Sequence, residues 1–137
     1  MNTSKRINGL NVQWPWSQLL LSGKKTIETR NYPIPAKHLG VPIALIETPG
    51  KKGKAVGAVS KSRIIGVVIF SECYKYADRD AWLKDFKGHR VAPDDSDFAF
   101  KDGMEKWAWV VKSVAKLNKP IAPPNPRGIV FCSGCRI

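Results

Sequence analysis

The chain has 137 residues, of which 43% are hydrophobic, and it carries a formal net charge of +12. This length and apolar content are typical of one compact domain with its own core. No stretch approaches the ~18 apolar residues that cross a bilayer, which excludes a membrane-spanning helix. An odd number of cysteines, three, does not suggest a secreted disulfide framework.

The positive charge is concentrated in the first half of the chain. Residues 1–63 contain 11 Lys and Arg against Glu28 and Glu47, whereas residues 64–137 contain 12 against 9 Asp and Glu. A basic patch is the electrostatic footprint of nucleic-acid binding, although solvated lysines also make a chain basic. The first six residues lack the apolar run of a signal peptide, so the cytoplasm is the expected location.

The beginning of the chain predicts a strand, a short helix and, after the charged segment described next, a further strand. Residues 1–8 are polar and are expected to fray. Leu10 and Val12 alternate with polar neighbours, as in a strand. Pro15 suits the first turn of a helix, which the leucines after it would bury. An apolar strand is expected over residues 41–46.

The segment Gly23–Arg30 mixes charges of both signs more closely than any other. Its β-branched residues favour a strand, on which successive side chains point to opposite faces. Glu28 and Arg30 would share one face, with Lys25 and Thr29 on the other. The carboxylate and guanidinium would then be near enough to form an ion pair. Such a pair contributes little to stability on an open surface, so structural and functional roles both remain open.

Residues 48–63 are rich in Gly, Lys and Ser and are expected to form a loop. The run Gly50–Lys54 is weakly similar to a phosphate-binding loop, because Gly lets backbone N–H groups approach an anion. It lacks the G-x-x-x-x-G-K-[ST] spacing. A solvated hairpin tip is the simpler interpretation.

The second half predicts a buried strand, a capped helix and an aromatic strand. Ile64–Phe70 is almost wholly apolar, as in a strand buried on both faces. Asp78 suits the N-cap of a helix through Phe86, and Gly88 is expected to end it. Trp107–Val111 alternates as a strand does.

Four prolines between residues 120 and 126 predict an extended connection to a last strand over Gly128–Phe131. Residues 132–137 are expected to be a loose tail. These elements together predict an α+β, mainly β fold, in which short strands form an antiparallel barrel with about two flanking helices.

Several stretches resemble the ASCH (activating signal cointegrator homology) domain family. Gly23, Lys25, Glu28 and Arg30 match its G-x-K-x-x-E-x-R signature. The other matching segments follow in family order: Pro15–Ser22, Gly66–Cys73, Trp107–Val111, Leu117, Lys119–Ile121 and Arg127–Gly128. The resemblance implies a PUA-like β-barrel domain over residues 9–131, between tails at 1–8 and 132–137. Two features depart from the family: Trp14 stands where many relatives have Gln, and residues 48–62 match no family pattern.

The resemblance and the basic charge favour binding of RNA, another nucleic acid or a modified nucleoside in a cleft beside the signature strand. The basic residues would meet phosphate or a base edge, and Glu28 would orient Arg30 or accept from a base amino group. Two tryptophans would offer a stacking face, because single strands bind to rings beside cations. The predicted nucleic-acid-binding residues are Trp14, Trp16, Lys24, Lys25, Glu28 and Arg30. We expect a monomer with no membrane partner.

An enzyme is the alternative, with Lys25 and Glu28 as the catalytic residues of a hydrolase acting on RNA or a nucleoside amide. A desolvated lysine can act as base or nucleophile, and a carboxylate beside it can shuttle a proton. The resemblance includes an acetylcytidine amidohydrolase, which has threonine in place of Glu28, so that Thr26 or Thr29 would have to supply that hydroxyl. A metal-free ribonuclease has also been associated with the family. A partner-binding adaptor is the third interpretation.

No metal or cofactor is expected. Cys132 and Cys135 have the spacing of a metal knuckle but supply only two ligands. The further candidates are distant in the sequence: Cys73, His38 and His89. The acidic turn over residues 94–97 lacks the spacing of an EF-hand, and turn chemistry explains its composition equally well.

Overall fold

The computed structural model describes residues 5–124 and 130–137. Its strands form one six-stranded sheet in the order β2-β5-β4-β3-β1-β6. The strands are β1 (Arg6–Gln13), β2 (Ile27–Arg30), β3 (Ile43–Thr48), β4 (Arg63–Lys75), β5 (Trp107–Ile121) and β6 (Phe131–Arg136). The helices are α1 (Trp16–Leu21), the 3-10 helix η1 (Ala36–His38), α2 (Gly50–Val56), α3 (Arg79–Lys84) and α4 (Phe86–His89). The prediction of a mainly β fold with short helices is confirmed.

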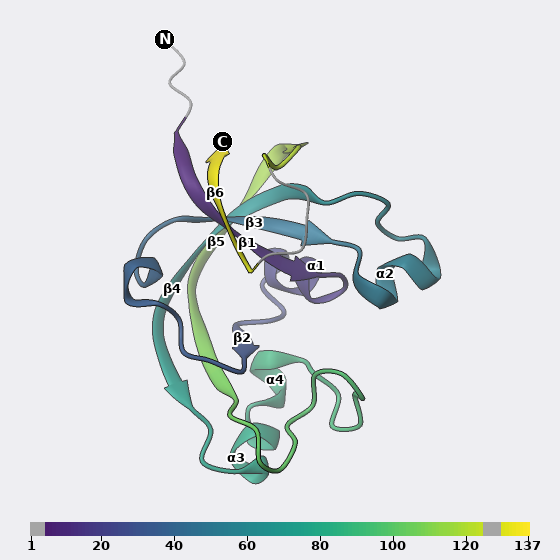
Figure 1. The fold of residues 1–137 in the computed structure, drawn as a ribbon, viewed down its shortest axis with the longest axis vertical. Coiled ribbons are helices and arrows are strands. Elements are labelled where there is room, and N and C mark those ends of the chain that lie inside the picture. The colour runs from purple at the N-terminus through teal and green to yellow at the C-terminus, as the bar shows by residue number, and fades with distance from the viewer. Residues whose placement is uncertain (1–4, 125–129) are drawn as a thin grey trace.

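The sheet is not the closed antiparallel barrel that the sequence predicts. β1 and β3 are parallel, whereas the other neighbouring pairs are antiparallel. β2 and β6 are edges, so the sheet is open among the described residues. Parallel neighbours need a crossover connection, and α1, β2 and η1 lie between β1 and β3 along the chain. β4 and β5 curve together along one side of the molecule (Figure 1), and the register shifts between them are of the kind that bends strands.

β4 and β5 both run further than their apolar patterns predict. The strands expected over Ile64–Phe70 and Trp107–Val111 are present, but β4 continues to Lys75 and β5 to Ile121. Pro120 therefore lies in β5 and not in the predicted connection, whose residues 125–129 are outside the described part of the chain. The second half of β5 is mostly exposed and has no buried residue. Pairing with β4, and not burial, keeps it extended.

The C-terminal segment forms β6, so the prediction of a loose tail over 132–137 is wrong. β6 pairs with β1, with Leu10 opposite Phe131 and Arg6 opposite Arg136. Cys132 and Cys135 are buried in a small apolar cluster with Ala44, Ile46 and Ile64. Cysteine behaves there as a small hydrophobe, so the two residues hold the strand in place. The same pairing makes Arg6 and its neighbours part of β1, where fraying was expected.

The lysine-rich segment forms helix α2, which corrects the prediction of a loop over residues 48–63. Lysine and alanine are good helix formers. Gly57 ends the helix in the left-handed conformation with φ 68°, and its N–H caps the carbonyls of Gly53 and Lys54. Gly53 is buried against Trp14, where an added Cβ would lie 3.3 Å from the tryptophan Cβ. The glycines that suggested a loop instead end the helix and let it pack closely.

The main core lies between the sheet and the helices below it in Figure 1. Its most buried large side chains include Trp82 of α3, Trp109 of β5 and Phe70 of β4. Gly88 does not end the predicted helix but lies within α4, where an added Cβ would be 2.6 Å from the Cδ1 of Ile27. α4 therefore packs closely against β2. No helix in residues 5–124 or 130–137 is long and apolar enough to cross a membrane.

The predicted N-cap is confirmed, because an Asp78 carboxylate oxygen accepts a hydrogen bond of 2.9 Å from the N–H of Ala81. We expect Asp78→Ala to reduce the free energy of unfolding by about 1 kcal/mol, since it leaves a helix-end donor without its cap. The measurement is the midpoint of urea denaturation. Asp78→Asn is the matched control and should stay near the wild-type value, because asparagine caps helices equally well. Equal losses in both variants would contradict the capping role.

Candidate functional site

A cavity of about 1040 Å³ opens between the start of α2, the ends of β1 and β2, and the loop that precedes β5. The signature side chains Lys25, Glu28 and Arg30 line it together with Trp16 and Lys106. β2 is an edge strand that pairs with β5. Glu28 and Arg30, which are two residues apart and share one face of β2, both line the cavity.

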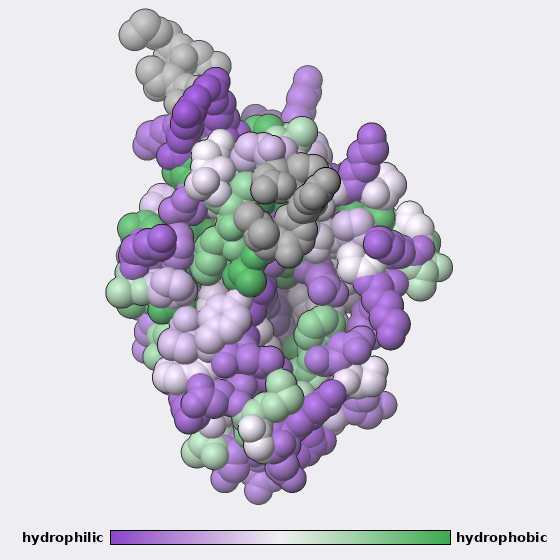
Figure 2. Space-filling model, in the orientation of Figure 1, coloured by the Kyte–Doolittle hydropathy of each residue, from purple (hydrophilic) through white to green (hydrophobic). Residues whose placement is uncertain are grey.

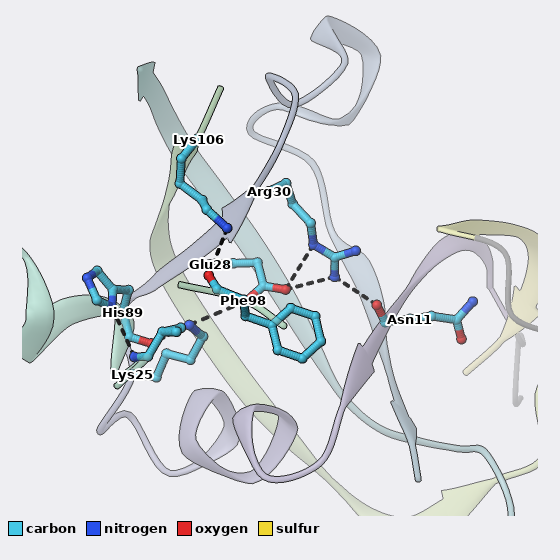
Figure 3. Close-up of polar contacts among 8 residues, drawn as sticks. Asn11, Lys25, Glu28, Arg30, His89, Phe98 and Lys106 are labelled. Carbon is cyan, nitrogen blue, oxygen red and sulfur yellow. Dashed lines mark hydrogen bonds and ion pairs between the residues drawn. The ribbon is translucent and has the colours of Figure 1, made fainter. Parts of the chain in front are cut away.

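Glu28 lies between two cations, Lys25 and Arg30 (Figure 3). These three residues and Lys106 line the cavity, and we call this group the floor of the cavity. Its Oε2 accepts hydrogen bonds from Arg30 Nη2 at 2.7 Å and Nε at 3.1 Å. Its Oε1 is 3.4 Å from the Nζ of Lys25. Arg30 Nη2 also donates to the carbonyl oxygen of Asn11 at 2.8 Å. The guanidinium is therefore fixed on β1 as well as on Glu28.

Lys25 reaches Glu28 although strand alternation places the two side chains on opposite faces. That prediction is wrong because Lys25 precedes β2 and lies in the turn after α1, where its N–H donates to the carbonyl of Leu19 at 2.9 Å. Alternation does not apply outside a strand. The side chain extends toward α4, and its ammonium donates to the carbonyl of His89 at 2.5 Å. The backbone turn before β2 therefore directs the long Lys25 side chain into the site.

Burial and mutual charge decide the protonation of this cluster. Lys25 is 1% exposed and Glu28 6% exposed. Burial lowers the pKa of Lys25 to about 8, and the nearby Glu28 offsets only part of that effect. Burial alone would raise the pKa of Glu28, but Arg30 and Lys25 outweigh it and hold the pKa below its usual value. Glu28 is therefore ionised at neutral pH, whereas Lys25 titrates close to the physiological range.

His89 positions Lys25 and is itself fixed. The N–H of Val91 donates to His89 Nδ1 at 2.9 Å, so the ring proton is on Nε2, which lies 2.8 Å from the carbonyl oxygen of Trp82. The ring stacks on Trp82 with centroids 4.7 Å apart. Burial lowers the pKa of His89 to about 4. His89 is thus a neutral, fully bonded core residue, whose carbonyl orients the lysine.

Solved structures of known proteins share the fold of this chain. No family model matches the chain, and no curated protein matches it. Among solved structures, the chain is similar to the crystal structure of ASCH from Zymomonas mobilis, with 19% identity, a TM-score of 0.63, and coverage of 84% of this chain and 72% of that one. A mutant form of the Zymomonas mobilis protein gives a TM-score of 0.67 at 17% identity, covering 92% of this chain and 86% of that one. This chain has the ASCH fold.

The two predicted stacking residues, Trp14 and Trp16, occupy different places. Trp16 lines the cavity but is only 8% exposed, because Phe98 packs edge-on against it with ring centroids 4.9 Å apart. Lys52 lies over the same ring at 5.8 Å and forms an ion pair with Asp95 at 3.4 Å. Trp14 does not line the cavity and packs against α2. Trp16 is therefore the tryptophan that can meet a ligand, from the side its neighbours leave open.

Two basic residues lie differently with respect to the cavity. Lys24 is exposed and does not line the cavity, and its carbonyl accepts from Arg90. Lys106 was not predicted, yet it is 5% exposed, lines the cavity, and donates from Nζ to the carbonyl of Phe98 at 2.8 Å (Figure 3). No pattern in the sequence singles it out, since it stands among polar residues just before β5.

The described residues contain no cluster of three or more His, Cys, Asp or Glu side chains that could hold a metal ion. Both ring nitrogens of His89 are already bonded. The buried Cys132 and Cys135 lie in the apolar cluster under β6 and do not line the cavity.

Glu28→Gln should lower the pKa of Lys25 below its value of about 8, because the Glu28 carboxylate raises that pKa while burial, Arg30 and Lys106 lower it. Its measurement is an NMR titration of the Lys25 side chain. Glu72→Gln, an exposed change on β4, is the control and should leave the titration unaltered. An unchanged or higher pKa in Glu28→Gln would show that the pair does not interact in solution.

Proposed function

We propose that this ASCH domain binds RNA, or a modified nucleoside, in the cavity around Lys25, Glu28 and Arg30. The observation that carries the proposal is the buried cluster itself: a fixed guanidinium, an ionised carboxylate and an ammonium face one hollow. Such groups offer donors and an acceptor to a base edge or a phosphate. Trp16 supplies an aromatic edge in the same wall.

The charge around the cavity supports a polyanionic ligand. Its described lining has five cationic side chains and two carboxylates: Lys25, Arg30, Lys54, Lys61, Lys106, Glu28 and Asp97. Hydrophilic side chains gather over α2 at the rim (Figure 2), and this helix contains three lysines and no acidic residue. A basic groove beside aromatic rings is the arrangement that binds single-stranded nucleic acid.

Lys25→Ala should weaken the affinity for a short single-stranded RNA at least tenfold, because it removes a buried cation and leaves Glu28 with Arg30 alone. The measurement is fluorescence anisotropy with a labelled RNA at several salt concentrations. The wild-type affinity should fall steeply as salt rises, since the counterions of RNA are released on binding.

Lys84→Ala is the matched control for that experiment. Lys84 is exposed on α3 and does not line the cavity, so the substitution makes the same change in net charge without touching the site. Its RNA affinity should stay within about twofold of wild type. Equal losses in the two variants, or affinity that does not depend on salt, would contradict the proposed site.

One observation favours an enzyme as second candidate: burial brings the pKa of Lys25 to about 8 beside an ionised carboxylate. A lysine with this pKa is partly neutral at pH 7–8 and can act as base or nucleophile. Thr29 lines the cavity and Thr26 does not, so Thr29 is the hydroxyl available for such chemistry. Incubation with acetylcytidine and with labelled RNA tests this candidate. Turnover that Lys25→Ala abolishes would favour the enzyme, whereas binding without turnover would favour the binding domain.

A further inference from the structure

We propose that the floor of the cavity binds the oxyanion of a phosphate group, held by Lys25, Arg30 and Lys106. This inference rests on the proposed function and specifies it: the ligand brings a phosphate to the floor, so it is a nucleotide or an oligonucleotide and not an uncharged nucleoside.

The floor has more hydrogen-bond donors than acceptors. An ammonium carries three N–H donors and a guanidinium five. Within the described residues, Lys25 uses its donors on His89 and Glu28, and Lys106 uses one on Phe98. Arg30 uses Nε and Nη2 on Glu28 and Asn11. The Tyr32 hydroxyl lies near the guanidinium without a hydrogen bond of full geometry, so Nη1 keeps donor capacity for a ligand.

Tyr32 adds a further buried polar atom. Tyr32 also lines the cavity; its hydroxyl makes no hydrogen bond of full geometry among the described residues, although it lies close enough to the Arg30 guanidinium to help raise the pKa of that group. Buried polar groups are normally bonded, and one that is not marks a place where a partner is missing. A ligand rich in acceptor oxygens would supply partners both to this hydroxyl and to the cationic donors.

The charge at the floor is also unbalanced. Three buried or half-buried cations surround one carboxylate, because Lys106 and Lys25 both lie within electrostatic range of Glu28 (Figure 3). Burial lowers the pKa of Lys106 as well as that of Lys25, and it outweighs the opposing effect of the nearby carboxylates, Glu28 for both lysines and Asp95 for Lys106. A bound anion would compensate the two ammonium groups. Among the described residues, Glu28 is the carboxylate at the floor and it already pairs with two cations, so this part of the cavity suits an anion better than a cation.

A phosphate fits this donor set better than a flat carboxylate. Its tetrahedral oxygens can accept at the same time from donors on different sides, and guanidinium groups match phosphate oxygens with a pair of parallel donors. Lys25 approaches from the turn before β2, Lys106 from the start of β5, and Arg30 from the end of β2. The phosphate could be a terminal monoester of a nucleotide or a diester within a strand.

Isothermal titration with cytidine, cytidine monophosphate and the dinucleotide CpC tests the inference in the wild-type protein. We expect at least one phosphate-bearing probe to bind about tenfold or more tightly than cytidine. Tighter binding of the monophosphate than of CpC would identify a terminal phosphate as the group bound, and the reverse would identify a diester. Equal affinity for all three probes would overturn the inference.

Lys106→Met tests the assignment to the floor, since it keeps the length of the side chain and removes the charge. It should weaken binding of the preferred phosphate-bearing probe about tenfold while leaving cytidine unchanged. Lys84→Met, the same substitution on exposed α3, is the control and should bind every probe like wild type. A loss that is equal for cytidine and for the phosphate probe would contradict a phosphate contact.

Inorganic phosphate gives a readout that does not depend on RNA binding. At matched ionic strength, phosphate should raise the melting temperature of the wild type above its value in chloride, and Lys106→Met should lose that shift. If phosphate and the nucleotide bind but RNA does not, the floor site stands and RNA binding is wrong. If RNA binds with the expected dependence on Lys25 while the phosphate effects are absent, the inference fails and the proposed function stands.

Discussion

The structure of the site depends on one buried carboxylate held between two cations. Glu28 is almost fully removed from water, which would favour its neutral form if Arg30 and Lys25 did not surround it. These cations also bond to backbone carbonyls outside β2: Arg30 to Asn11 on β1, and Lys25 to His89 on α4. The ion cluster therefore connects an edge strand, which has one neighbour in the sheet, to two other parts of the fold.

This arrangement explains how a buried lysine with a lowered pKa is held in a small domain. His89 is neutral, stacked and bonded at both ring nitrogens, so its carbonyl is a fixed acceptor for Lys25. Gly88 allows α4 to approach β2 closely enough for that contact. The lysine consequently stays buried with a lowered pKa, and its ammonium is directed at the cavity floor and not at solvent.

The wall opposite the cluster is built by α2 and by the loop before β5. α2 places lysines at the rim, and one of them, Lys52, reaches across to Asp95 over the ring of Trp16. Phe98 covers the same ring from another side. At 17–19% identity, the similarity to the Zymomonas mobilis structures shows the fold alone. α2 and the loop before β5 therefore shape the side of the cavity that faces the ion cluster.

Local chemistry determined much of what the sequence predicted. The Glu28–Arg30 pair follows from alternation along a strand, and the Asp78 cap follows from a side chain three residues from its donor. The buried centre of β4 follows from an apolar run. Each of these depends on neighbours in the chain, so residue order is sufficient to predict it.

Only the tertiary structure decided the rest. The parallel pairing of β1 with β3, the strand at the C-terminus and the burial of Lys106 all depend on residues far apart in the chain. Lys25 meets His89, 64 positions away, because α4 docks on β2, and no spacing within the signature reports that contact. The sequence by itself determined which charges stand next to one another. The packing of distant elements decided which of those charges are taken out of water, and therefore which of them can hold a ligand.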